Sequence, residues 1–133
     1  MAIQYSSTIY LGQLDLVESS AGATAKLYIF SGSAPANCAA ADSGTLLATL
    51  TLPSDWMAAA SGTSKILAGS WTGTASGGSA TAPTHFRIKD NAGTTVHVQG
   101  TSGVGSGDLS LNGAITSGQT ITISSFTLNA ANT

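Results

Sequence analysis

Charged residues are unusually scarce in this sequence. Only 8% of the 133 residues are Asp, Glu, Lys or Arg, and the net charge is −2. Nucleic-acid binding needs clustered cations that neutralise phosphates, whereas here only Arg87 and Lys89 are neighbours, so we expect no nucleic-acid partner. Low charge also weakens the repulsion between copies of a protein. The composition therefore favours burial of this chain in a large assembly.

Cysteine and long apolar runs are also scarce. Cys38 is the only cysteine, which excludes an internal disulfide and fits synthesis in a reducing cytosol. No apolar run approaches the roughly 20 residues that a transmembrane helix needs. The first residues show neither the basic region nor the apolar region of a secretory signal. The sequence therefore predicts no membrane partner.

No group of residues predicts catalysis or a bound cofactor. Cys38 stands among alanines, without a neighbouring base that would activate its thiol. His85 and His97 have no third ligand at metal-binding spacing, so surface positions are expected for both. Trp56 and Trp71 could stack on sugars, but we predict that both pack in the core. The expected protein is not an enzyme and needs no cofactor or metal.

The first 22 residues differ from the rest of the chain. They are predicted to form an extended arm followed by a short helix, with Ser6 or Ser7 as N-cap and Gly22 as the stop. A short strand over residues 3–9 is the alternative. Asp15 and Glu18 fall on the side opposite the apolar stripe. The stripe has helical spacing and consists of Tyr10, Leu14, Val17 and Ala21. The arm could pack on its own domain or on a neighbouring subunit.

Residues 23–133 are predicted to form an antiparallel β-sandwich, because short alternating runs are separated by Gly, Ser and Asn turns. The fold class is therefore all-β, with an N-terminal arm or short helix. About seven strands are expected, at residues 26–31, 45–52, 65–74, 85–89, 95–99, 107–111 and 119–128. Apolar residues on both faces of the first strand predict that it is covered on both sides.

Local patterns add further detail to this prediction. Residues 32–44 form a loop of small residues, and residues 54–60 resemble one or two helical turns capped by Ser54. In the second strand, Leu46, Ala48, Leu50 and Leu52 are expected to point inward. A bulge at residues 124–125 would keep the apolar side chains of the last strand in the core.

The hairpin at residues 85–99 has the clearest turn signal. A three-residue loop, Asn91–Gly93, pairs Ile88 with Val96 on the inner face and places Gly93 in the left-handed position that this loop requires. In that register Phe86 faces Val98, whereas Arg87 and His85 point outward, opposite His97 and Gln99. A four-residue loop would set Phe86 opposite His97, which matches an apolar residue with a polar one.

Four runs resemble a family of small virion proteins of tailed bacteriophages. They are LYIFSGSAPANCAAA (27–41), GTLLATLTLP (44–53), HFRIKDNAGTTVHVQG (85–100) and SGQTITI (117–123). The likeness covers most of the chain after about residue 8. Members of the family are described as head decoration, tail-fibre-like or hypothetical proteins. The family offers no catalytic motif, so no functional residue is transferred.

The resemblance implies a virion structural protein made in the bacterial host cytoplasm and located on the particle surface. We expect a capsid decoration (cement) protein whose partners are the major capsid protein and other virion proteins. A closed homo-oligomer, with a trimer favoured, would fit a lattice symmetry position. The alternatives are a neck, tail or fibre component that acts as an adaptor or contacts the host, and a carbohydrate-binding module. The candidate assembly contacts are Ile9, Tyr10, Leu14, Val17, Arg87 and Lys89.

Overall fold

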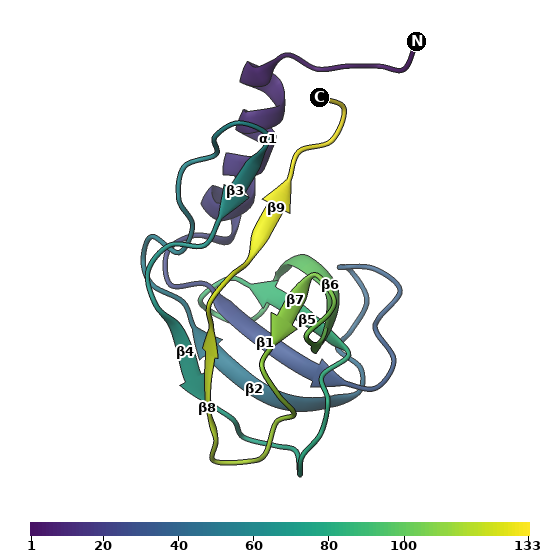
Figure 1. Ribbon diagram of the computed structural model, residues 1–133, viewed down its shortest axis with the longest axis vertical. Helices are drawn as coiled ribbons and strands as arrows, with labels where there is room; N and C mark the ends of the chain where they lie inside the picture. The colour runs from purple at the N-terminus through teal and green to yellow at the C-terminus, as the bar shows by residue number, and fades with distance from the viewer.

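The structure is a computed structural model that describes residues 1–133, and strands are its main element (Figure 1). A single helix, α1 (Ser7–Ala21), precedes nine strands. These are β1 (Lys26–Ser31), β2 (Thr45–Thr51), β3 (Ser64–Ile66), β4 (Trp71–Thr74), β5 (His85–Lys89), β6 (Val96–Val104), β7 (Leu109–Leu111), β8 (Thr120–Ile123) and β9 (Thr127–Asn129).

Five strands form one curled sheet in the order β2-β1-β5-β6-β7 (Figure 1). Its pairs are antiparallel except for the parallel β6–β7 pair. The pairs β4–β8 and β3–β9 are separate antiparallel ladders of two strands. The predicted β-rich fold with an N-terminal helix is therefore present. A sandwich of two antiparallel sheets is not confirmed, because the main sheet is mixed and the other ladders are short.

Two of the expected strands are each broken in the middle. Gly69, with a φ of +70°, separates β3 from β4. Residues 124–126 separate β8 from β9. The segments at the two breaks are joined by a hydrogen bond from the Leu67 N–H to the carbonyl of Phe126 (3.0 Å). The predicted bulge is therefore a full break, although Phe126 stays buried as expected. The β4–β8 ladder lies beside the curled sheet, whereas β3–β9 projects from it next to α1 (Figure 1).

We call residues 1–21 together with β3 and β9 the N-terminal lobe. Its helix has the predicted limits: Ser6 is the N-cap, and Gly22 (φ +83°) ends it, donating its N–H to the Glu18 carbonyl. The alternative strand at residues 3–9 does not form. Within the predicted stripe, Leu14 and Ala21 are buried, and Tyr10 and Val17 are half-buried. This face of α1 therefore packs on its own chain.

Aromatic rings form the centre of the core. Trp56, Trp71, Phe126 and Phe86 follow one another with ring centroids 5.9, 5.4 and 5.6 Å apart. The Trp71 indole N–H donates to the carbonyl of Trp56 (3.0 Å). Both tryptophans have no exposed surface, so the prediction that they pack in the core is confirmed. The hypothesis that a sugar stacks on Trp71 is therefore wrong, because no face of its ring is exposed.

Ala48, Leu50 and Leu52 are buried as predicted for the second strand, and only Leu46 differs. The β1–β2 register shifts between Ile29 and Phe30, whose partners are Ala48 and Leu46. This irregularity leaves Leu47 without a cross-strand partner, and Leu47 is fully buried while Leu46 is 36% exposed. The alternation of side chains along a strand reverses at such a bulge.

The helical turns expected at residues 54–60 do not form. Backbone N–H groups in this segment find acceptors elsewhere: Met57 donates to the Glu18 carboxylate (2.9 Å), and Ala60 donates to Asp15 (2.9 Å). Ala58 donates to the carbonyl of Ile66. These tertiary bonds replace the bonds along the chain that a helix would need.

The hairpin between β5 and β6 forms, but its predicted register is wrong by two residues. Ile88 pairs with Val98, and an irregularity between Ile88 and Lys89 leaves His97 unpaired. The Asp90 carboxylate accepts the Thr94 N–H (2.9 Å), which lengthens the loop beyond Gly93. A shift of two residues keeps every side chain on the same face of the strand, and Gly93 has the expected positive φ of +73°.

The loop 32–44 covers the second face of the curled sheet. Gln99 donates to the carbonyl of Pro35 (3.1 Å), and the Thr84 hydroxyl donates to that of Gly32 (2.6 Å). Gly44 closes the loop with a φ of +79°, where an added Cβ would collide with the carbonyl of Ser31. On this face Phe30 is buried and stacks on His85, whereas Tyr28 is half-buried with Lys89 over its ring, so side chains of the same chain cover β1 on its second face as predicted.

Candidate assembly site

Arg87 holds the covering loop against the sheet. The sequence places it on the outer face of β5, yet only 1% of its surface is exposed. Its guanidinium donates to Asp42 Oδ1 (2.6 Å) and to Gln99 Oε1 (3.1 Å), from Nη1 and Nε. Nη2 lies within 2.8–3.3 Å of the carbonyls of Asn37, Cys38 and Ala40. The predicted face of Arg87 is right, but the side chain is not at the surface, because the loop encloses its head group.

Lys89 joins the same cluster from the end of β5. Its Nζ lies 2.6 Å from Asp42 Oδ2 and 4.6 Å from the centre of the Tyr28 ring. Burial by itself would raise the pKa of Asp42, but the hydrogen bonds from Lys89 and Arg87 lower it below 3.8. One carboxylate therefore bridges two cations, and charge-assisted bonds of this kind are about twice as strong as neutral ones.

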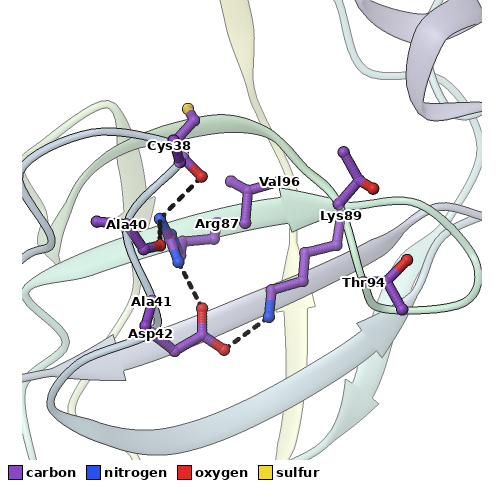
Figure 2. Close-up of a pocket in the computed structure, with 10 residues that line it drawn as sticks. Cys38, Ala40, Ala41, Asp42, Arg87, Lys89, Thr94 and Val96 are labelled. Carbon is purple, nitrogen blue, oxygen red and sulfur yellow. Dashed lines mark hydrogen bonds and ion pairs between the residues drawn. The ribbon is translucent and has the colours of Figure 1, made fainter.

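A hollow of about 570 Å³ lies over this cluster. Figure 2 shows Asp42 between Arg87 and Lys89, with Cys38 and Ala40 next to Arg87 and Thr94 beyond Lys89. The cations in the hollow make bonds to their own chain, which fixes the position of the loop. Cys38 is half-buried and its carbonyl accepts from Arg87, so the backbone of this residue has a structural role.

His85 is a second polar group enclosed by the loop. It is 1% exposed, and its ring stacks on Phe30 with centroids 5.0 Å apart. Because the Thr84 hydroxyl proton goes to Gly32, Nδ1 is the donor in the 3.1 Å bond to Thr84, and Nε2 has no partner. The surface position expected for His85 is wrong, although the predicted face of β5 is right. Burial lowers the pKa of His85 below 6.5, so the ring is neutral under the loop.

The neutral ring predicts a loss of stability in mild acid. The unfolded chain binds a proton on His85 as the pH falls through 6.5, whereas the folded chain binds it only at its lower pKa. Stability is therefore complete above pH 6.5 and falls as the pH drops toward the folded pKa. Urea unfolding at a series of pH values measures this loss, and His85→Asn is expected to flatten the profile.

His97→Asn is the matched control, because it removes the other imidazole of the chain. The carboxylates affect stability at a lower pH. The pKa of Asp42 lies below 3.8, so the stability that this carboxylate contributes is lost only as the pH falls through that lower pKa. An unchanged slope between pH 5 and 7 in His85→Asn would contradict the assignment to His85.

A second ion cluster joins α1 to β3. Lys65, 2% exposed, lies 2.7 Å from Asp15 Oδ1 and 3.2 Å from Glu18 Oε1. Burial opposes the charge of Lys65, yet its hydrogen bonds to Asp15 and Glu18 raise its pKa above 10.5. The bond from Lys65 in turn lowers the pKa of Asp15. Asp15 and Glu18 lie opposite the apolar stripe in the sequence pattern, yet both carboxylates bind groups of β3 and of the segment 54–60.

The two clusters use most of the basic residues of the chain. Three of the four cations, Lys65, Arg87 and Lys89, are buried and paired, and Lys26 on β1 is half-buried. The exposed charged residues are consequently carboxylates, namely Asp15, Asp42, Asp55 and Asp108. The outer surface is poor in charge, and it has almost no positive charge.

Exposed apolar side chains gather on the N-terminal lobe. Eight large apolar residues are exposed, and two of them, Leu46 and Val104, lie on the curled sheet. The other six belong to the lobe and are Met1, Ile3, Tyr5, Ile9, Leu16 and Ile66. Exposed apolar residues concentrated in one part of a chain make that part the candidate for a protein–protein contact.

The predicted assembly contacts divide between these features. Ile9 is 48% exposed on α1 and Tyr10 is half-buried, so both can reach a neighbour. Leu14 and Val17 pack on the chain itself, and Arg87 and Lys89 are enclosed by the loop 32–44. The structure adds Leu16, Ile3 and Ile66, which sequence periodicity does not mark because they lie outside the apolar stripe.

Comparisons with known proteins add nothing to this description. No family model, curated protein or solved structure matches the chain. No three His, Cys, Asp or Glu side chains are grouped so that they could hold a metal ion. The single helix lacks the length and apolar content needed to span a membrane.

Proposed function

We propose that the chain is a non-enzymatic structural protein of a tailed-bacteriophage virion, and that it acts as a decoration (cement) protein on the outer capsid lattice. The resemblance of four sequence runs to small phage virion proteins supports the class of protein that we propose, a virion structural protein. The observation that carries the proposal is the surface: it is poor in charge, and six of its eight exposed large apolar side chains lie on one lobe.

Such a surface suits permanent burial against other proteins. Each Å² of apolar surface removed from water contributes roughly 25 cal/mol. The segment before α1 is extended, and its first three odd-numbered residues, Met1, Ile3 and Tyr5, are all exposed. The Tyr5 N–H donates to the carbonyl of Asn132 (2.7 Å) and Gln4 Nε2 donates to that of Thr133 (3.4 Å), so both bonds tie the segment to the end of the chain. In the proposed role this segment reaches the capsid and is covered there.

Binding of this kind would stabilise the shell by mass action. A protein that binds the assembled lattice and not the free subunits shifts the equilibrium toward the lattice. The ion clusters at Arg87 and Lys65 leave few charges for contacts with the shell. Apolar and backbone contacts would therefore provide the affinity, and moderate salt is expected to weaken it little.

The number of copies per particle tests this proposal. Purified virions of the phage that encodes the chain are analysed by quantitative mass spectrometry against the major capsid protein. We expect copies of the same order as the capsid protein. A few copies per particle would instead support the neck, tail or fibre alternative. Absence from the particle would overturn a virion role altogether.

A pair of substitutions tests the surface itself. Ile3→Glu adds a charge to the arm and is expected to reduce the copies bound to the particle. Val104→Glu adds the same charge at an exposed position on β6, outside the lobe, and is expected to leave the copy number unchanged. Equal effects of both variants would contradict a specific role of the lobe.

A further inference from the structure

The segment between β7 and β8 contains the one Asn-Gly pair of the chain. Five asparagines are present, and only Asn112 is followed by glycine. Such a pair commonly closes a two-residue hairpin turn, where the ladder on both sides holds it. Here it closes no hairpin, because β7 pairs with β6 and β8 pairs with β4. The strands on either side therefore do not fix the conformation of this pair.

The backbone of residues 112–114 makes no hydrogen bond. None of its N–H groups donates and none of its carbonyls accepts. The Asn112 side chain is exposed, and it has no hydrogen-bond partner in the chain either. Leu111 and Ile115, on the two sides, are buried and make backbone hydrogen bonds. The segment is thus held at its ends and free between them.

Gly113 leaves room for its own nitrogen to approach the Asn112 side chain. A Cβ added at Gly113 would have nothing within 4 Å, so no other part of the fold crowds this residue. Glycine also permits backbone conformations that other residues rarely adopt, and it allows a close approach to the backbone. Two groups held next to each other in one chain react far faster than the same groups free in solution.

We propose that Asn112 is a site of self-modification, which slowly becomes aspartate and isoaspartate in the folded protein. The Gly113 nitrogen attacks Cγ of Asn112, so that an N–Cγ bond forms and the Cγ–Nδ2 bond breaks. Nδ2 leaves as ammonia with the proton of the Gly113 N–H, and a succinimide remains. Water then adds to one of the two ring carbonyls and opens the ring. The reaction needs only water, and the inference does not rest on the proposed function.

The other asparagines lack this combination of features. Each of them is followed by a residue with a Cβ. Two are also held by hydrogen bonds: Asn37 Oδ1 accepts the Ala39 N–H (2.9 Å), and Asn91 Nδ2 donates to the Thr24 carbonyl (3.1 Å). The conversion is therefore selective for Asn112.

The product changes a part of the chain that has no charge. Residues 109–133 contain no charged side chain, and the conversion adds one negative charge there to a chain whose net charge is −2. Isoaspartate also routes the main chain through the side-chain carbons, which lengthens the segment between Leu111 and Ile115. That segment has no backbone hydrogen bond to lose, so the fold persists while the surface becomes more acidic with time.

Peptide mapping of aged protein tests the site. The purified protein is incubated in mildly alkaline buffer, digested and analysed by mass spectrometry, and isoaspartate is detected by labelling with an isoaspartyl methyltransferase. We expect both products to accumulate at position 112, faster at higher pH because the attacking nitrogen must lose its proton. The rate is expected to lie within about threefold of the rate in chain denatured with guanidinium chloride, because the segment has little structure to open. Much slower conversion in the folded protein would overturn the proposal.

Gly113→Ala is the matched variant. It keeps Asn112 and adds a Cβ where the structure has open space, so the variant is expected to keep its fold. Near-ultraviolet circular dichroism of the buried tryptophans checks this. The conversion is expected to slow roughly tenfold or more, because alanine restricts the approach of its nitrogen. Equal rates in the variant and the natural sequence, or equal conversion of Asn91 and Asn112, would contradict the assignment to the Asn112–Gly113 pair.

Discussion

Replacing Arg87 by alanine is expected to lower the free energy of unfolding by on the order of 3 kcal/mol, because the polar groups that its guanidinium binds are left without a donor. The guanidinium is 1% exposed and is bonded to Asp42, to Gln99 and to three carbonyls of the loop 32–44. Without it, these acceptors lose their donor under a loop with no regular structure. Urea unfolding followed by tryptophan fluorescence measures the loss.

Two further variants show why the loss of Arg87 lowers the stability. Arg87→Met keeps most of the side-chain volume but no donor, so it is expected to lose nearly as much as Arg87→Ala. Lys26→Ala removes a half-buried lysine of β1 that takes part in no ion pair, and it is expected to cost less than about 1 kcal/mol. A methionine variant close to the natural stability would show that packing, rather than hydrogen bonding, is what Arg87 supplies.

A loosened loop also gives a local signal. Elastase cleaves beside small residues, and the loop contains the run Cys38–Ala41. Faster cleavage there is expected in Arg87→Ala under conditions where the rest of the chain stays folded. Equal cleavage rates in Arg87→Ala and the natural sequence would contradict the role of Arg87 in holding the loop.

The fate of Arg87 shows what could be predicted from the sequence and what could not. Alternation placed Arg87 and His85 on one face of a strand and Phe86 and Ile88 on the other, which is right. It could not show that the face is covered, because the cover is a distant loop without periodicity. One signal was available: Phe30 and Tyr28 lie on the same face of β1, and apolar residues there required a cover.

The helix and the segment 54–60 give the complementary case. Local signals predicted both ends of α1, at Ser6 and Gly22, although the Ser6 side chain makes no capping hydrogen bond. The same kind of signal failed at Ser54, because the N–H groups of Met57 and Ala60 bind Glu18 and Asp15 of α1. Tertiary hydrogen bonds overrode a weak local propensity. The lobe itself was not predictable, because it joins residues more than 40 positions apart.

Deleting residues 1–20 is expected to destabilise the protein by on the order of 5 kcal/mol, enough to unfold a domain of ordinary stability. From the sequence alone, this deletion would be expected to remove an arm and leave the β domain folded. The structure predicts otherwise: buried Leu14 is lost, and Lys65, 2% exposed, loses both of its carboxylate partners. Far-ultraviolet circular dichroism and urea unfolding measure the effect.

Deleting residues 1–4 is the matched control and is expected to change the free energy of unfolding by no more than about 0.5 kcal/mol, because these residues are exposed. Adding Lys65→Met to the 1–20 deletion is expected to recover part of the loss, since it removes the unpaired buried charge. A 1–20 deletion with natural stability would show that α1 is merely attached to the β-rich body. If the loss is found, assembly must be tested by substitutions on the outward face of α1, because a deletion would remove the fold together with the contact.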